Sequence, residues 1–228
     1  MIPSWFLIES DPADPPFNMA LDEALMIFGP LLKLPVLRFY RWSKPAATFG
    51  YFQSIAAVEC LTPLRPLIRR PTGGGIVPHE SDWTYSLVLP PGHDWYDLRA
   101  IESYQRLHRW LQSAWARLGV PTQLAPQARR EGPGRCFVGA EQHDLLWRNH
   151  KIAGAAQRRS RQSLLIQGSV QQMPAGIDRR DWQQALCEAA TQAWDADWIP
   201  LEPSGELLDQ ARRLDFDKYS REEYNRKR

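Results

Sequence analysis

The stretch RRPTGGGIVPH, residues 69–79, places three consecutive glycines after two arginines and a proline. Glycine loses more backbone freedom on folding than any other residue, so such a run indicates a linker, a tight turn or a close approach of backbone to a ligand. Strand-like segments flank this run, whereas a flexible linker is usually longer and richer in serine. The run matches neither the P-loop nor the dinucleotide-binding pattern. We therefore expect a hairpin or a ligand loop at Gly73, Gly74 and Gly75.

The residues beside the glycines carry groups that suit an anion. Arg69 and Arg70 precede the run, and guanidinium groups pair well with phosphate or carboxylate. His79 follows it, either as a donor or wall residue of a ligand site or in the satisfied structural position that is more common for a lone histidine.

Composition narrows the class of protein. The 228 residues are 43% hydrophobic and 24% charged with a formal net charge of +2, which is ordinary for a soluble globular chain and gives no overall nucleic-acid signature. No apolar run approaches the roughly 20 residues that span a bilayer, and the N-terminus lacks the pattern of a signal peptide. We expect a cytoplasmic protein with no membrane and no nucleic-acid partner. Cys60, Cys136 and Cys187 form neither a disulfide framework nor a zinc motif, so no metal is expected.

The pattern of apolar residues predicts both helices and strands. Helical spacing occurs in residues 17–28, 100–119 and 181–194. Strand-like segments are residues 36–42, 47–52, 83–90, 136–147, 150–157 and 163–170. Their order predicts one α+β domain over residues 1–228 with helices packed on a sheet, a core over about 5–200 and a helical or frayed tail over about 207–228. Within that tail, we expect EEYNRKR to be frayed and solvated.

Three side chains receive ordinary structural interpretations. His108 falls on the polar face of the 100–119 helix and is expected to be solvated. Cys187 falls among the apolar positions of the 181–194 helix, and Cys60 lies in an apolar segment, so both are expected in the core.

Lys151 opens the strand-like segment HKIAGAAQ, residues 150–157. The small side chains of Gly154 and Ala155 leave room for something to lie across this strand. A lysine that opens a strand is usually a solvated edge charge. If Lys151 instead faces a cleft, it offers a compact positive charge for a carbonyl oxygen or a phosphate.

Cys136 follows a Gly-Pro-Gly-Arg turn, which places it near the mouth of a loop. Arg129, Arg130 and Arg135 precede it, and cationic neighbours lower the pKa of a thiol and increase its thiolate fraction. Cys136 is therefore a candidate nucleophile, with an unreactive thiol as the alternative.

Taken together and in order, these segments resemble the lipoate attachment family of lipoate–protein ligases, octanoyltransferases and biotin–protein ligases. The resemblance covers roughly residues 5–175 and rests on FNMALDEAL, LRFYRW with ATFGYFQ, RRPTGGGIVPH and HKIAGAAQ. It implies a central mixed, mostly antiparallel sheet packed with helices, of the biotin/lipoate–protein ligase catalytic-domain type. It also implies a set of substrate-binding residues: Arg69, Arg70, Thr72, Gly73, Gly74, Gly75, His79, Gly154, Ala155 and Gln167.

Within that family the chain resembles the cysteine-dependent octanoyltransferases. Cys136 lies 15 positions before Lys151, and the resemblance implies that these two are the catalytic residues. In this interpretation an octanoyl or lipoyl group passes from a carrier-protein thioester through a Cys136 acyl-enzyme to a lysine, and no cofactor is required. Two positions depart from the family pattern: Gly75 stands where that branch commonly has arginine, and Gln167 stands where histidine is usual.

Two other functions stay open. The first is an ATP-dependent lipoate–protein ligase that forms an acyl-adenylate with ATP and magnesium, in which Cys136 is a bystander. The second is a member that binds a carrier domain or ligand without chemistry, which Gln167 favours.

The resemblance implies two protein partners, an acyl carrier protein or other acyl donor, and a lipoyl-domain protein of the glycine cleavage H protein or 2-oxoacid dehydrogenase E2 type. Because such partners tend to be acidic, a basic middle region can steer their approach, unless its loops are merely solvated. That region comprises Arg129, Arg130, Arg135, Lys151, Arg158, Arg159 and Arg161.

Overall fold

A computed structural model describes residues 4–130 and 139–227. Its main sheet has eight strands in the order β13-β1-β2-β6-β12-β11-β10-β7. The strands are β1 Ser4–Glu9, β2 Val36–Tyr40, β6 Trp83–Leu89, β7 Gln123–Leu124, β10 Leu145–Trp147, β11 His150–Arg159, β12 Leu164–Val170 and β13 Asp197–Pro200. Only β1 pairs in parallel, with β2 and β13, and the other five pairings are antiparallel. The expectation of a mixed, mostly antiparallel sheet is confirmed.

Two smaller sheets flank the main one. The strands β3 Ala46–Phe49, β4 Leu67–Arg69 and β5 Val77–His79 form a three-stranded sheet with β3 in the middle. The short strands β8 Arg129–Arg130 and β9 Gly139–Ala140 pair with each other. The sequence predicted one strand over residues 136–147, but its described part contains the two short strands β9 and β10 with a turn between them.

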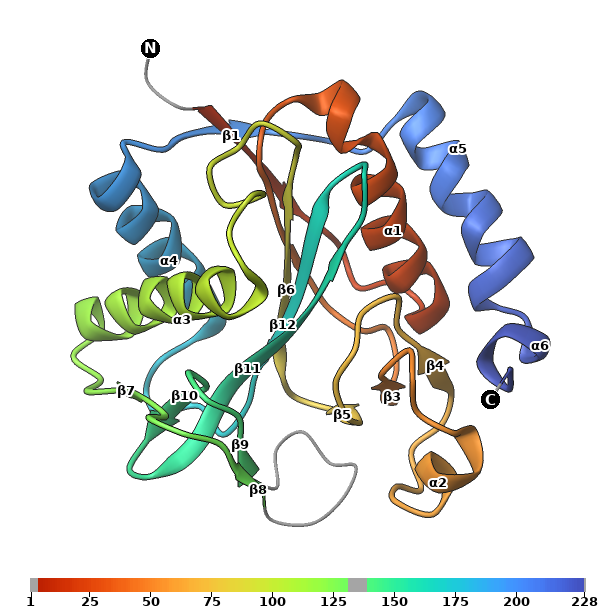
Figure 1. Ribbon diagram of the computed structural model, residues 1–228, viewed down its shortest axis with the longest axis horizontal. Coiled ribbons are helices and arrows are strands. Elements are labelled where there is room, and N and C mark those ends of the chain that lie inside the picture. Colours follow the sequence, from red (N-terminus) through yellow and green to blue (C-terminus); the bar gives the residue numbers. More distant parts are fainter. Residues whose placement is uncertain (1–3, 131–138, 228) are drawn as a thin grey trace.

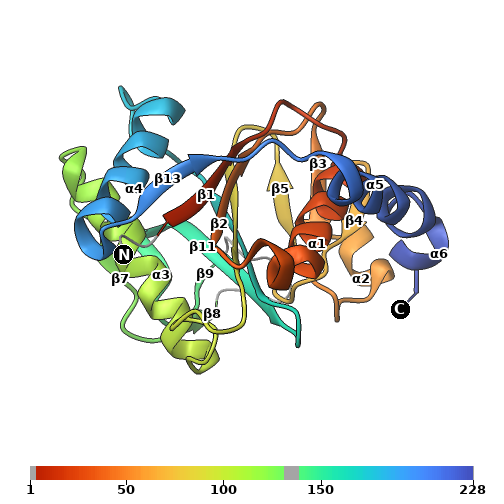
Figure 2. The same cartoon turned by 90° about the horizontal axis from the view of Figure 1, so that it is seen from above.

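The helices cover the two faces of the main sheet (Figures 1 and 2). On one face lie α3 Ala100–Arg117 and α4 Arg179–Trp194, which contact each other. On the other lie α1 Pro15–Leu32 and α5 Gly205–Leu214, which also contact each other. The three helices predicted from apolar spacing are confirmed as α1, α3 and α4. The short helix α2 Ile55–Glu59 connects β3 to β4.

The last part of the chain is ordered. The π-helix Asp215–Tyr219 continues from α5, and α6 Glu222–Asn225 packs against β4. Arg69 fixes this segment, because its backbone nitrogen donates to Asn225 Oδ1 at 2.8 Å and its guanidinium donates to the Asn225 carbonyl oxygen at 3.0 Å. The helical tail is therefore as predicted, but the expectation that EEYNRKR frays is wrong for residues 222–225.

Side chains alternate between the two faces of the sheet, as the period of a strand requires. The face toward α3 and α4 is mainly apolar, with Phe39, Tyr85, Leu87 and Ile166 in one core cluster. The face toward α1 changes along the strands. Near α5 it is apolar, whereas toward the other end of the strands it becomes polar in the rows described below.

Two structural expectations from the sequence are wrong. His108 is fully buried, because strands β7, β10 and β11 pack against the face of α3 that looks polar in sequence. Cys60 is exposed, because α2 is a five-residue surface helix of which only Val58 is buried. Cys187 is partly buried at the edge of the core, close to the expectation, and burial raises the pKa of its thiol to about 12.

Within the described ranges, no helix combines the length and the hydropathy that a bilayer crossing requires.

Candidate functional site

The polar end of the α1-facing side of the sheet forms the floor of a pocket. Hydrogen-bonded register aligns two rows of residues across β11, β12, β6 and β2. The first row is Gly154, Ser169, Thr84 and Tyr40. The second is Ala156, Gln167, Ser86 and Arg38. The pocket lies over the first row and over Ala156 and Gln167 of the second, and it holds about 440 Å³ of empty space, part of which is open to solvent. Small side chains on β11 therefore do leave space above the strand.

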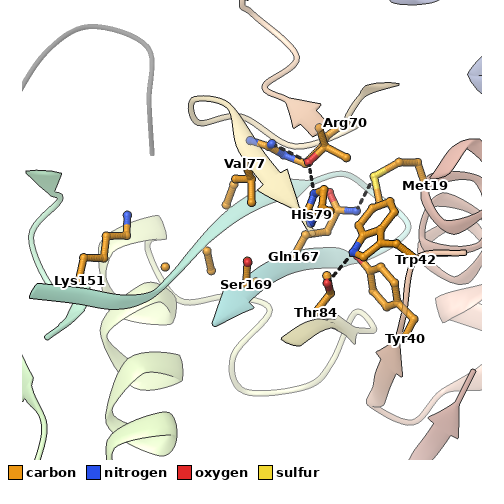
Figure 3. Close-up of a pocket in the computed structure, with 15 residues that line it drawn as sticks. Met19, Tyr40, Trp42, Arg70, Val77, His79, Thr84, Lys151, Gln167 and Ser169 are labelled. Carbon is orange, nitrogen blue, oxygen red and sulfur yellow. Dashed lines mark hydrogen bonds between the residues drawn. The ribbon is translucent and has the colours of Figure 1, made fainter. Parts of the chain in front are cut away.

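Residues outside the main sheet complete the walls of the pocket (Figure 3). They come from α1, the β2–β3 connection and the three-stranded sheet: Met19, Trp42, Thr48, Arg70, Val77 and His79. Trp42 and Tyr40 lie at one end of the pocket and Lys151 lies at the other (Figure 3). The pocket is thus elongated across the strands, with an aromatic end and a cationic end.

His79 belongs to the wall through a fixed hydrogen-bond network. Its ring stacks on Trp42 with 3.9 Å between the ring centroids. Its Nε2 lies 2.8 Å from Thr48 Oγ1, and its Nδ1 lies 2.8 Å from Asp82 Oδ2. Burial acts to raise the pKa of Asp82, but the charge of His79 and hydrogen bonds from His79, Ser169 and Thr84 outweigh it and leave that pKa below 3.8. His79 therefore presents its ring to the pocket while its nitrogens are engaged elsewhere.

Gln167 is also held on both sides. Its Nε2 donates to Asp22 Oδ2 at 2.8 Å, and its Oε1 accepts from the hydroxyl of Thr72 at 2.8 Å. Asp22 is fully buried on α1 and also accepts from Arg38 at 2.7 Å. This arrangement ties the loop after β4 to the floor of the pocket and to α1. Gln167 and Thr72, both predicted as site residues, are brought together here, although Thr72 itself does not contribute to the pocket lining described above.

The glycine run is a closely packed loop beside the pocket. Arg70 lines the pocket, and its Nη2 donates to the carbonyl oxygens of Gly73 at 2.7 Å and Gly75 at 2.8 Å. Gly74 has a φ of 85° and its carbonyl approaches Gly50 so closely that a Cβ at position 50 would collide with it. The backbone of the glycine run therefore packs against the backbone at Gly50. None of the three glycines is among the described residues that line the pocket.

Arg69 lies away from the pocket. Its buried guanidinium donates to carbonyl oxygens of Tyr51 and Gln53, each at 2.8 Å, as well as to the C-terminal segment. The sequence suggested an anion site at this arginine. The structure corrects that interpretation, because these backbone oxygens occupy the donors that an anion would need.

Lys151 closes the other end of the pocket. Its Nζ lies 2.8 Å from Asp144 Oδ2, and the two side chains are 7% and 0% exposed. Lys151 is thus not the solvated edge charge that opens most strands. Asp144 Oδ1 accepts a hydrogen bond from the hydroxyl of Tyr104 on α3, and the Tyr104 oxygen accepts one from the backbone nitrogen of Ala155 at 3.2 Å. Burial, followed by the charge of Asp144, raises the pKa of Tyr104 well above its ordinary value.

Cys136, like Arg135, lies outside the described residues, so its distance from Lys151 is not given by the structure. The described residues on either side of that segment do lie near Lys151. Arg129, Gly139 and Ala140 line a hollow on the surface to which Lys151 also contributes.

Sequence reasoning missed several residues of the site. These residues were not predicted as parts of the site: Asp22, Trp42, Asp82, Tyr104 and Asp144. Their common feature is a polar group buried against the sheet from an element distant in sequence. A buried acid inside an otherwise apolar helix, as Asp22 is in MALDEAL, is the one local signal that was present.

Known proteins resemble this chain in sequence and in fold. Residues 14–192 match the model of the "Lipoyl protein ligase A/B catalytic domain" family. A protein named octanoyltransferase LipM from Oceanobacillus iheyensis is 35% identical over 172 residues, covering 73% of this chain and 63% of the relative. One of the same name from Symbiobacterium thermophilum is 36% identical over 184 residues, covering 73% and 65%. The chain thus spans a little under two thirds of the length of these relatives.

Solved structures share the fold. A lipoate-protein ligase A bound with ATP aligns over 99% of both chains with a TM-score of 0.80 and 20% identity. The putative lipoate protein ligase Ta0514 from T. acidophilum with bound lipoic acid aligns over 100% of both chains, also with a TM-score of 0.80, at 21% identity. The expected fold type is confirmed by these likenesses.

Proposed function

This chain belongs to the lipoyl protein ligase A/B catalytic domain family, and from that premise we propose that it is an acyltransferase. It moves an octanoyl or lipoyl group from a carrier-protein thioester to the lysine of a lipoyl domain. The curated relatives that carry the name octanoyltransferase LipM support this assignment. The proposal treats residues 1–228 as one catalytic domain, and the hydrogen bonds of Lys218 and Tyr219 to α1 are consistent with this because they pack the C-terminal segment on the rest of the fold.

The observation that carries the proposal is the shape of the pocket. Its long axis crosses three strand spacings from β11 to β2, which is about 14 Å when neighbouring strands lie about 4.8 Å apart. An extended chain advances about 1.2 Å per bond, so eight carbons span about 8 Å. In this proposal the tail lies between the small floor residues of β11 and the aromatic end at Trp42, with its carbonyl toward Lys151.

The proposed reaction has two acyl-transfer steps. The thiolate of Cys136 attacks the donor thioester, forms a new thioester on the enzyme and releases the thiolate of the carrier protein, which takes up a proton from solvent. The amine of the acceptor lysine then attacks that acyl group, forms the amide, loses a proton to solvent and releases the thiolate of Cys136. Lys151 lies at the carbonyl end of the pocket, where its ammonium stabilises the negative charge on the oxygen in both steps.

A thioester donor requires no ATP, because its acyl group is already activated. An ATP-dependent ligase remains the alternative, since a lipoate-protein ligase A bound with ATP shares the fold. In that alternative, Lys151 and Arg70 hold an acyl-adenylate and Cys136 takes no part.

The proposed partners are an acyl carrier protein and a lipoyl domain. Arg129 and Arg148 are exposed near the end of β11 that carries Lys151, and they add positive charge toward acidic partners. Turnover with the carrier protein should therefore fall as salt is raised, and a rate independent of salt would argue against electrostatic steering.

The test is mass spectrometry of the protein after incubation with octanoyl carrier protein and a lipoyl domain, with and without ATP. The proposal expects an octanoyl adduct on the enzyme and modified lipoyl domain without ATP, and no adduct on the Cys136→Ser variant. Modification that needs ATP and octanoate and leaves no adduct supports the ligase. Unchanged turnover by Cys136→Ser would refute covalent catalysis by this thiol.

A further inference from the structure

We propose that Asp144 is a positioning residue, which holds the ammonium of Lys151 over Gly154 at the mouth of the acyl pocket. Tyr104 fixes the carboxylate and joins it to the backbone of the pocket wall. The role assigned to Lys151 rests on the proposed function, whereas the placement of its ammonium by Asp144 can be measured without it.

The carboxylate of Asp144 is held from several sides. It is fully buried, and its Oδ2 accepts from the backbone nitrogen of Glu141 at 2.6 Å in addition to pairing with Lys151. Its Oδ1 accepts from Tyr104, which is itself held by the backbone nitrogen of Ala155. Ala155 lines the acyl pocket, so the carboxylate is tied to the same strand as the lysine that it orients.

Gly154 supplies the space that the lysine side chain occupies. A Cβ at this position would lie 2.5 Å from Lys151 Cε, 2.7 Å from Nζ and 3.0 Å from Asp144 Oδ1. The lysine therefore folds back across the glycine toward Asp144. Any side chain here would push the ammonium away from the carboxylate, and the end of a lysine can move without a shift of backbone.

Stability alone does not account for this ion pair. A buried ion pair loses so much hydration that its net contribution to folding is commonly near zero, although removing one partner is costly. A second pair, Lys218 with Glu23 at 2.6 Å, joins α1 to the C-terminal segment and does not line the acyl pocket. The pair at Lys151 differs because its cation lines both the pocket and the surface hollow.

Other titratable groups also lie near the ion pair between Lys151 and Asp144. His108 and Tyr85 lie on the side of the core and His143 lies on the turn before Asp144. Burial lowers the pKa of His108 to about 4, so this ring is neutral near pH 7 and supplies no charge to Lys151 or Asp144. Within residues 4–130 and 139–227, Asp144 is an anion that pairs directly with the ammonium.

The first experiment measures the state of Lys151 directly. The folded protein is acetylated briefly with acetic anhydride, which reacts with neutral amines, and the peptide containing Lys151 is quantified by mass spectrometry. In Asp144→Asn the Lys151 side chain loses the carboxylate that holds it over Gly154, so its amine can move toward the surface hollow and meet the reagent. Labelling of Lys151 should rise by about tenfold or more, because removing one partner of a buried ion pair strongly weakens its hold on the other. Exposed Lys33 serves as the internal reference, and unchanged labelling of Lys218 shows that the variant is folded.

Matched variants separate positioning from general damage. Glu23→Gln breaks the Lys218 pair and should increase labelling of Lys218 while Lys151 stays as in the wild type. Gly154→Ala keeps Asp144 but displaces the ammonium, and Tyr104→Phe removes one hydrogen bond from the carboxylate. Both should increase labelling of Lys151, less than Asp144→Asn does. Equal labelling of Lys151 in the wild type and in folded Asp144→Asn would overturn the inference.

The second experiment asks whether the placement matters for transfer. With octanoyl carrier protein, Asp144→Asn and Gly154→Ala should lower kcat by about tenfold or more with KM changed less than about twofold, because the ammonium acts on the reacting carbonyl rather than on binding. Glu23→Gln should keep the wild-type kcat. A loss confined to KM would overturn the positioning role. A wild type that transfers no acyl group would refute the proposed function, and the labelling result would still decide whether Asp144 places Lys151.

Discussion

Acidification is expected to destabilise the fold through His108. This ring is fully buried on α3, its Nδ1 lies 2.9 Å from the carbonyl oxygen of Tyr104, and its Nε2 meets no hydrogen-bond partner within residues 4–130 and 139–227. Burial lowers its pKa from 6.5 to about 4, against the weaker opposite effect of the charge on Asp144. A second proton on this ring would place a charge in the core with an unsatisfied N–H.

The size of this loss of stability follows from the pKa values of His108 in the unfolded and the folded chain. The unfolded chain binds the proton as the pH falls through about 6.5, whereas the folded chain binds it only near 4, so stability is lost over that window. Integrating the difference from pH 7 to pH 4 gives a loss on the order of 3 kcal/mol from this residue alone. The pKa of Asp82 is lowered below 3.8, so the stability that it contributes is present above that value and is lost only at lower pH, outside this window.

The assay is urea unfolding followed by tryptophan fluorescence at several pH values between about 7 and 4, with linear extrapolation to water. His108→Asn removes the titrating ring and keeps an amide donor for the Tyr104 carbonyl, so its stability should depend less on pH than that of the wild type. His93, whose pKa burial also lowers, is present in both proteins and cancels in the comparison. Exposed His150→Asn is the control and should follow the wild type. Parallel curves for the wild type and His108→Asn would refute the reasoning.

Two further predictions concern the glycine loop and its anchor. Gly50→Ala should destabilise the protein by about 1–3 kcal/mol, because the added methyl group collides with the Gly74 carbonyl, whereas Gly73→Ala meets nothing within 4 Å and should change stability by less than about 0.5 kcal/mol. Equal midpoints in thermal unfolding of these two variants would contradict this packing. Arg69→Met should cost about 3 kcal/mol or more, because it leaves backbone oxygens of residues 51, 53 and 225 without their donor. Limited proteolysis should then cleave first in the C-terminal segment, and a wild-type cleavage pattern would disprove the anchoring role.

The main helices, several strands of the central sheet and the open strand of the pocket floor could be predicted from the amino-acid sequence. Apolar spacing placed the three main helices, and the small residues after Lys151 indicated a strand that something can lie across. These features are local, because the period of a helix or a strand and the size of a side chain are written in consecutive residues. In Gly154 and Ala155 the structure shows the same open strand at one end of the pocket.

The contacts of the polar residues could not be predicted from the sequence, because they depend on how the chain folds. Arg69 looks like an anion ligand in sequence, yet its guanidinium binds Asn225, a residue 156 positions away. His108 looks solvated because only one face of its helix is apolar, yet three strands cover the other face. Lys151 pairs with Asp144, which follows a turn, and Tyr104 of α3 holds that carboxylate, and neither residue forms a recognisable motif with the lysine. Burial and hydrogen bonding depend on which distant segments meet, and no local period records that.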